Sequence, residues 1–458
     1  MTVVEKIQGC ITLFIGNFLD NTSRTNNMPR TRSFNNRSHS DSVTMDVLKD
    51  FPEDFAKALK TSFELLKNFN VRYMEENYSF IEKYWRFSYI FVTISIHVFS
   101  LGFHMPELLT EDEMTQFAYL IPSILVTIHA VLKSIVLIPM TRQISTFISE
   151  LGSLWRVAFT EKQFKAKDGV LWRLDFVNRA SYWASLTGSA QYLLSPLFET
   201  LFRRFVLKQD CELLLPFASD FPLDHTNNWL YYLLIYIFQL YSMFLLVSLY
   251  TGTALIMISC CALLGAEFLM LKDDLARVKP ESCGTISNTD QVDENYNINK
   301  DLTIEEFVKK HQKLLELSRQ LDNVFNGIVF IDLLFVGITT CAFSFMGQFA
   351  RGPGYMLISY IGIASSMFTI LYLCYYGELL TSASSSIGDT AYENVWYQGS
   401  RRYKMAIYFI IKISQKPCCL TSIRYAEVSM KMFTKLHLII FFLRLGFVRL
   451  SLDCVTEL

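Results

Sequence analysis

Polar and aromatic side chains recur at helical spacing within several otherwise apolar stretches of this 458-residue sequence. Intervals of three and four residues place such side chains on one face of a helix. Helices that turned these faces toward one another would enclose an apolar, aromatic-rich cavity with a few hydrogen-bonding groups. Such a cavity suits a small, mostly hydrophobic molecule. The predicted ligand-binding residues are Phe117, Tyr119, Gly188, Gln191, Ser195, Tyr232, Tyr236, Gln239, Ser359 and Tyr360.

The same ten residues also have a purely structural interpretation. Small residues such as Gly188 let membrane helices approach closely, and tyrosines such as Tyr236 gather at membrane interfaces. Taken singly, each residue therefore fits helix packing as well as ligand binding.

A second set of residues places charge within the apolar stretches. His129 and Lys133 are four residues apart and share a helix face. Asp332, near the cytoplasmic end of its own predicted span, could pair with Lys133. Ionisable side chains within membrane spans are rare, and each is a candidate functional residue. Arg86 and Lys435 lie at span ends, where a long side chain reaches the interface instead.

Motifs that carry catalysis are absent from the sequence. It has no H-E-x-x-H, no Walker A lysine loop, no G-x-S-x-G and no kinase signature. The ten cysteines form no C-x-x-C pair, and the net charge of −1 gives no reason to expect a nucleic-acid partner. We therefore expect no enzyme activity, no metal and no cofactor.

The elements that must position these residues are membrane-spanning helices. Hydrophobic residues make up 51% of the chain and charged residues 19%, and long uncharged runs alternate with charged ones. About 20 apolar residues cross the hydrocarbon core of a bilayer. The sequence therefore predicts an all-α polytopic membrane protein with seven transmembrane helices. The predicted spans are 85–103, 117–139, 180–201, 229–250, 325–349, 355–376 and 429–448.

Lys and Arg in the connecting segments indicate the orientation, because they accumulate on the cytoplasmic side. The first 84 residues hold eleven of them, the segment 104–116 none and the segment 140–179 seven. High and low counts of Lys and Arg continue to alternate along the chain only if the uncharged run between His225 and Glu267 forms a single membrane span. The helix would then extend beyond the bilayer. We therefore expect a plasma-membrane protein with a cytoplasmic N-terminus and an extracellular C-terminus.

This orientation divides the chain into predicted regions. Residues 1–44 form a disordered polar extension, 45–84 a cytoplasmic helical region and 85–448 the seven-helix domain. Apolar residues at helical spacing outside the spans predict a cytoplasmic helical anchor layer from 251–277, 302–324 and 377–424. Residues 449–458 would form an extracellular tail.

Three stretches, in this order and spacing, resemble the insect odorant receptor family. They are Leu215-Pro216-Phe217 with the segment leading into Trp229, then Cys374-Tyr-Tyr-Gly-Glu378 with Ser384 to Tyr397, and finally Ile413-Ser-Gln-Lys-Pro417 with Val428 to Lys435. The resemblance covers residues 45–435. The family's usual closing Ser/Thr-Tyr-Phe signature is absent from 436–458, where Arg444 and Arg449 interrupt the apolar run, so no pore residue is carried over.

The resemblance implies a receptor for small volatile, mostly hydrophobic odorants in an olfactory sensory neuron. It also implies gating of a cation channel together with a co-receptor subunit, as a hetero-oligomer (a tetramer) surrounded by membrane lipid. The alternatives are a gustatory-type receptor, a G-protein-coupled receptor, or a non-conducting membrane protein if the divergent last helix is defective. A G-protein-coupled receptor would need an external N-terminus and D-R-Y and N-P-x-x-Y motifs, which this chain lacks.

Overall fold

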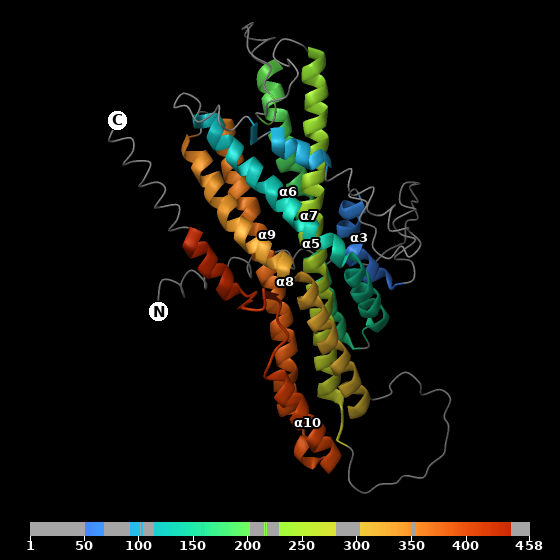
Figure 1. Ribbon diagram of the computed structural model, residues 1–458. Helices are drawn as coiled ribbons and strands as arrows, with labels where there is room; N and C mark the ends of the chain where they lie inside the picture. Colours follow the sequence, from blue (N-terminus) through green and yellow to red (C-terminus); the bar gives the residue numbers. More distant parts are fainter. Residues whose placement is uncertain are drawn as a thin grey trace.

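The computed structural model describes residues 51–67, 92–100, 102–103, 114–156, 158, 160–201, 215, 217, 229–280, 303–349 and 353–440. Over these residues the chain is almost wholly helical, and the long helices form one elongated bundle (Figure 1). The all-α fold class of a polytopic membrane protein is thereby confirmed.

Five helices of 41 to 49 residues make up the body of the bundle. At 1.5 Å per residue each is roughly twice as long as a bilayer's hydrocarbon core is thick, so each extends well beyond it. They are α5 (Met114–Leu154), α6 (Glu161–Leu201), α7 (Trp229–Arg277), α8 (Ile304–Phe349) and α9 (Pro353–Glu393). Shorter elements are α3 (Glu53–Lys67), the 3-10 helix η4 (Trp396–Gln398) and α10 (Arg401–Ser414), and residues 92–100, 102–103 and 430–440 are also helical.

Helix α7 runs along the centre of the bundle and contacts α3, α5, α6, α8 and α9. Every residue from 251 to 266 is buried, which explains why this stretch carries no charge on any side. The long uncharged run is therefore one unbroken helix. Gly252 permits its close contact with α3, because a Cβ there would lie 2.8 Å from Leu66 Cγ.

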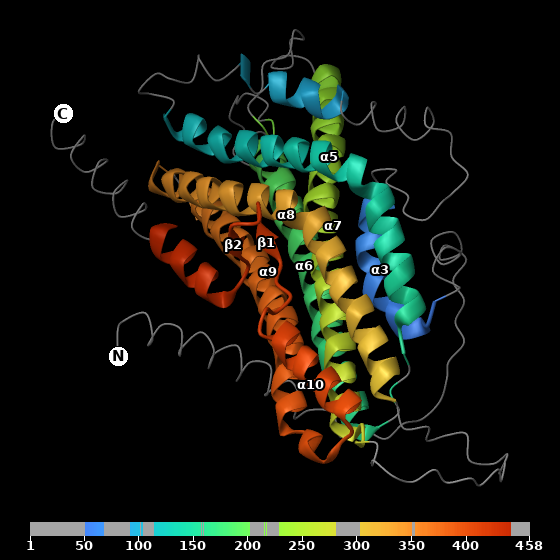
Figure 2. The ribbon, with the colours of Figure 1, turned by 60° about the horizontal axis from the view of Figure 1, so that its bottom comes forward.

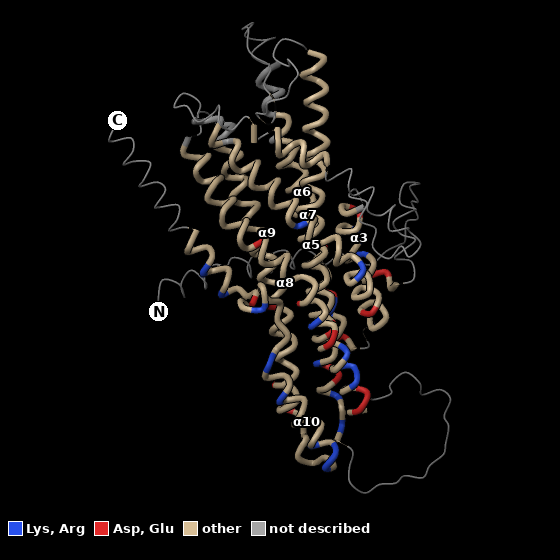
Figure 3. The backbone as a smooth tube through the Cα atoms, viewed as in Figure 1, with Lys and Arg blue, Asp and Glu red and all other residues tan. Residues whose placement is uncertain are grey.

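Charge divides the bundle into two halves along its length. Lys, Arg, Asp and Glu gather on the lower half of the described helices in Figure 3, whereas the upper helical segments carry almost none. The charge-poor half contains the beginnings of α5, α7 and α9 and the ends of α6 and α8. This is the distribution that a protein with one half in lipid and the other in water requires.

The direction of α5 changes along its length, and Figure 2 shows its first part lying beside α8. The helix contains Pro122 and Pro139, and each proline removes one hydrogen bond from the helical ladder. In its second half α5 reaches α3, where Phe55 packs against Trp155 with ring centroids 5.3 Å apart.

A small antiparallel hairpin lies between α10 and the helix at 430–440. The sequence did not predict this hairpin. Its strands are β1 (Thr421–Ser422) and β2 (Ala426–Glu427). Asp322 on α8 accepts hydrogen bonds from Thr421 N at 2.6 Å and Thr421 Oγ1 at 2.8 Å. The hairpin thus fixes the start of the last helix against α8.

Four described helices are long and apolar enough to cross a membrane, at Leu120–Leu154, Trp229–Arg277, Ile304–Gln348 and Met356–Glu393. They contain most or all of the predicted spans 117–139, 229–250, 325–349 and 355–376. The predicted span 180–201 is the second half of α6. The first and last predicted spans are described only over residues 92–100, 102–103 and 430–440, and residues 1–44 and 449–458 lie outside the described residues.

Candidate functional site

Five apolar side chains from different parts of the sequence meet in the charge-poor half of the bundle. They are Leu120, Leu193, Phe217, Met346 and Ile358, each less than 9% exposed, and we call them the apolar cluster. The half-buried residues Phe117, Ile124, Met243 and Phe343 pack around them. Helices α5 to α9 and the segment before α7 all contribute, so the cluster responds to any shift among these helices.

Polar side chains beside the cluster bind backbone groups of neighbouring segments. The Tyr236 hydroxyl donates to the carbonyl of Leu193 at 2.7 Å. Gln239 Nε2 donates to the Phe217 carbonyl at 3.0 Å, while Gln239 Oε1 accepts from Phe217 N at 3.2 Å. Gln239 therefore pairs with both backbone groups of one residue and holds Phe217 in the cluster.

A third polar contact joins the ends of α8 and α9. Ser359 is 2% exposed, and its hydroxyl donates to the carbonyl of Phe343 at 2.5 Å. Like those of Tyr236 and Gln239, this side chain binds a backbone group of another segment, so its own polar atom is not left unpaired in an apolar environment.

Tyr232 lies next to this region and belongs to an aromatic row on α7. It is 1% exposed, and its ring centroid lies 5.8 Å from those of both Trp229 and Tyr236. The structure thus brings together Phe117, Tyr236, Gln239 and Ser359 at or beside the apolar cluster, with Tyr232 adjoining.

The other predicted site residues lie elsewhere or are not described. Gly188 and Gln191 are half-buried on α6, and Ile361 Cγ2 is the nearest atom to a Cβ built on Gly188, at 3.9 Å. Tyr360 is 58% exposed on the surface of α9. Its expected place in the cavity is therefore corrected, because α9 presents Ser359 to the bundle and turns the next residue outward. The side chains of Tyr119 and Ser195 lie outside the described residues.

The sequence interpretation missed His97, whose buried ring contacts this site. Its centroid lies 5.0 Å from that of Phe217 in an edge-to-face arrangement. A histidine within a predicted membrane span was the signal that could have found it.

Three ionisable side chains meet deeper in the bundle, between α5 and α8. Asp332 Oδ1 lies 2.6 Å from Lys133 Nζ and 2.8 Å from His129 Nε2, which confirms the predicted pairing with Lys133. The three side chains are 0 to 3% exposed. The Lys133 ammonium also lies 4.6 Å from the ring centroid of Tyr250 on α7, so this ion-pair cluster connects three helices.

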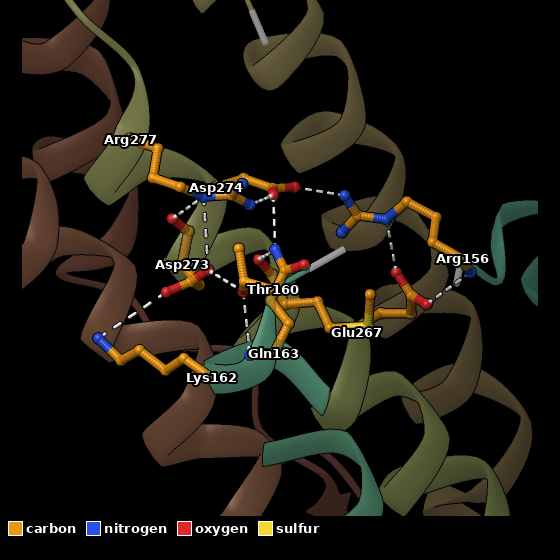
Figure 4. A network of polar contacts seen from close by, with 9 residues as sticks. Arg156, Thr160, Lys162, Gln163, Glu267, Asp273, Asp274 and Arg277 are labelled. Atoms are coloured by element: carbon orange, nitrogen blue, oxygen red, sulfur yellow. Dashed lines mark hydrogen bonds and ion pairs between the residues drawn. The ribbon is translucent and has the colours of Figure 1, made fainter. Parts of the chain in front are cut away.

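A network of polar contacts joins the turn between α5 and α6 to α7 in the charge-rich half (Figure 4). Arg156 pairs with Glu267 through Nε and Oε2 at 3.1 Å and also with Asp274. Thr160 Oγ1 accepts from Gln163 N at the start of α6 and donates to Asp273, both at 3.1 Å. Burial disfavours the charge of Arg156, but its two carboxylate partners outweigh this effect and raise its pKa.

Helix α3 is attached to the same turn by a second set of contacts. Lys167 Nζ lies 2.7 Å from Asp54 and 4.2 Å from the ring centroid of Trp155. Partial burial opposes ionisation of Asp54, yet the hydrogen bond and charge of Lys167 and the Trp155 indole lower its pKa below the usual range. Among the described residues, no group of three or more His, Cys, Asp and Glu side chains could hold a metal.

Comparison with known proteins identifies a matching family and similar relatives. The family model described as 7tm Odorant receptor matches residues 113–439, which include all of α5 to α10. Odorant receptor 85c of Drosophila melanogaster is 25% identical over 222 residues, which are 48% of this chain and 54% of that relative. Odorant receptor 13a of the same species is 22% identical over 234 residues, covering 48% and 53%. The chain thus matches about half the length of each relative.

Solved structures show the same fold. The insect olfactory receptor OR5 from Machilis hrabei superposes with a TM-score of 0.69 over 87% of this chain and all of that chain, at 12% identity. The same receptor in complex with eugenol superposes with a TM-score of 0.67, covering 89% and 99% of the two chains at 12% identity.

Proposed function

This chain belongs to the insect odorant receptor family, and on that premise we propose that it is an odorant-binding subunit of a ligand-gated cation channel. The observation that carries the proposal is the apolar cluster, where five helices and the segment before α7 meet in the charge-poor half. A small hydrophobic molecule inserted there would change contacts on all of these elements together. The likeness to a receptor solved in complex with eugenol, a small aromatic volatile, supports this type of ligand.

Gating would follow from a difference in odorant affinity between two packings of these helices. The shift cannot exceed that difference in binding free energy. Half-buried Phe117, Met243 and Phe343 surround the cluster, and the flexible methionine adapts readily to a new neighbour. Helix α8 would transmit the change, because it contributes Phe343 and Met346 near one end and Asp332 to the ion-pair cluster in its middle.

A co-receptor subunit would bind the charge-rich half, which we place in the cytoplasm of an olfactory neuron. Helix α10 buries Tyr403, Ile407 and Ile410 against the bundle. Its other side exposes apolar residues, with Tyr408 57% and Phe409 51% exposed. Exposed apolar surface in the aqueous half of a membrane protein is typical of a subunit contact, which supports assembly into a hetero-oligomer, expected to be a tetramer.

The proposal is tested by expressing the chain in frog oocytes with and without a family co-receptor and recording currents against an odorant panel. We expect currents that require the co-receptor and persist when G proteins are blocked. If the chain reaches the surface and no odorant evokes current, residues after Lys435 are replaced by a typical family last helix. Restored current would locate the defect in the divergent terminus, and silence of both forms would contradict the channel function.

A further inference from the structure

His97 is a buried histidine beside the apolar cluster, and none of the hydrogen bonds described above uses its ring nitrogens. It lies in the helical segment 92–100 and is 0% exposed. Its ring meets Phe217 edge-on, with the planes at 81° and the centroids 5.0 Å apart. Because Gln239 holds Phe217 by both backbone groups, this wall of the site is fixed in place.

Within the described part of the chain, neither ring nitrogen of His97 has a hydrogen-bond partner. An imidazole always carries at least one N–H donor. Leaving such a group unpaired away from water costs about 1–3 kcal/mol. Buried polar groups of this kind are few in proteins, and each calls for an explanation.

The other polar groups at the cluster are already engaged. Tyr236, Gln239 and Ser359 each bind backbone atoms. A ligand oxygen would have to compete with a backbone carbonyl for the hydroxyl hydrogen of Tyr236 or Ser359, and Gln239 is already held by both backbone groups of Phe217. The His97 imidazole requires no such exchange. The hydroxyl of Thr340 on α8 is likewise buried without a partner among the described residues, but Thr340 is neither in the apolar cluster nor one of the residues that pack around it.

We propose that His97 is the polar anchor of the odorant site and donates a hydrogen bond to an oxygen atom of the ligand. The ligand class is then a small hydrophobic molecule with one accessible oxygen acceptor, such as a ketone, aldehyde, ester or alcohol. This inference rests on the proposed odorant-binding function and narrows it. A site whose buried donor is left unpaired discriminates against the hydrocarbon analogue, which offers no acceptor.

The test compares ketones with hydrocarbons of the same shape, in which a C=CH₂ group replaces C=O. Suitable pairs are acetophenone with isopropenylbenzene and 2-heptanone with 2-methyl-1-heptene, extended to other ketone pairs across the panel. Two measurements are made for each compound: co-receptor-dependent current in oocytes, and thermal stabilisation of the purified chain. The second reports binding whether or not the channel conducts.

Three variants separate hydrogen bonding from packing. His97→Phe keeps a ring against Phe217 and removes the donor, while His97→Gln keeps a donor in a different shape. His311→Phe is the matched control, because His311 is 3% exposed and its Nε2 has no partner in the described part of the chain, but it lies near the charge-rich end of α8.

We expect the wild-type chain to prefer the ketone of a pair. His97→Phe should weaken ketone binding by roughly tenfold, the value of one hydrogen bond of about 1.4 kcal/mol, and leave the hydrocarbon unchanged or tighter. His97→Gln should retain most of the preference, and His311→Phe all of it.

If His97→Phe weakened binding of the ketone and of the hydrocarbon equally, His97 would have a packing role and the inference would be overturned. A wild-type chain that binds hydrocarbons as tightly as ketones would also overturn it, although odorant binding itself would then stand. If the folded chain bound no ketone and no hydrocarbon and gave no current with any of them, both the proposed function and this inference would be contradicted.

Discussion

Tyr236, which we propose as a ligand contact, also holds two helices together. Its ring lies in the aromatic row of α7, and its hydroxyl donates to Leu193 of α6. Gln239, one turn further along, holds Phe217 in the same way. Residues chosen from sequence as ligand contacts thus set the spacing of the helices that form the site, so their substitution should act on odorant potency through that spacing.

Tyr236→Phe tests this role. The change removes the hydrogen bond from α7 to the Leu193 carbonyl of α6, a loss of about 0.5–1.5 kcal/mol. We expect a lower unfolding temperature and an altered odorant dose response with normal surface expression. Tyr360→Phe is the control, since its side chain is 58% exposed. An unchanged dose response in Tyr236→Phe would exclude the hydroxyl from the site.

The ion-pair cluster of His129, Lys133 and Asp332 makes a second prediction at the residue scale. Removing one charge from a buried pair leaves the other uncompensated, which costs about 3–5 kcal/mol, whereas removing both charges is often neutral. Asp332→Asn should therefore destabilise the purified chain more than the double variant Asp332→Asn with Lys133→Met. Thermal unfolding in detergent measures both together with Lys133→Met alone, and a loss in the double variant equal to the sum of the two single losses would show that the two charges act independently.

At the scale of the helices, the turn between α5 and α6 is joined to α7 by several polar contacts. Arg156 neutralises two carboxylates of α7, and Thr160 begins α6 as its cap. Lys167 then joins α6 to α3 through Asp54. These contacts hold the charge-rich ends of four helices together, so a helix movement begun at the apolar cluster would be transmitted along helices anchored at this turn.

The attachment of α3 should depend on pH. Because Lys167 and Trp155 hold the pKa of Asp54 below its usual range despite partial burial, the ionised carboxylate stabilises the folded state. That contribution is complete above the unfolded value of about 3.9 and is lost as the pH falls through the lower folded value.

We therefore expect hydrogen exchange of α3, corrected for its intrinsic rate, to accelerate below about pH 4. Asp54→Asn should show less protection throughout and no acceleration of its own in this range. An identical pH profile in the variant would assign the effect to other carboxylates.

For the whole molecule, orientation follows from charge. The charge-rich half would face the cytoplasm, because Lys and Arg are retained there. An N-glycosylation sequon placed within 202–228 should then be modified in cells, and one placed within 281–302 should not. Glycosidase-sensitive mobility shifts on gels report both, and the reverse pattern would invert the topology.

The sequence by itself determined the all-helical membrane fold, the division into apolar and charged regions, and the single course of α7. These depend on local hydropathy and on the rule that a backbone in lipid must satisfy its own hydrogen bonds. It also indicated the pairing of Lys133 with Asp332, because charges at similar membrane depth must find partners.

Only the tertiary structure decided which side chains meet. It turned Tyr360 outward and Ser359 inward and engaged Tyr236 and Gln239 with backbone groups. Among the residues that the structure describes, it gave neither ring nitrogen of His97 a hydrogen-bond partner beside Phe217. Helical periodicity identifies a face but not the rotation of that face toward its neighbours. In a membrane that rotation depends on packing among helices distant in sequence, since lipid tails are as apolar as the helix surfaces themselves.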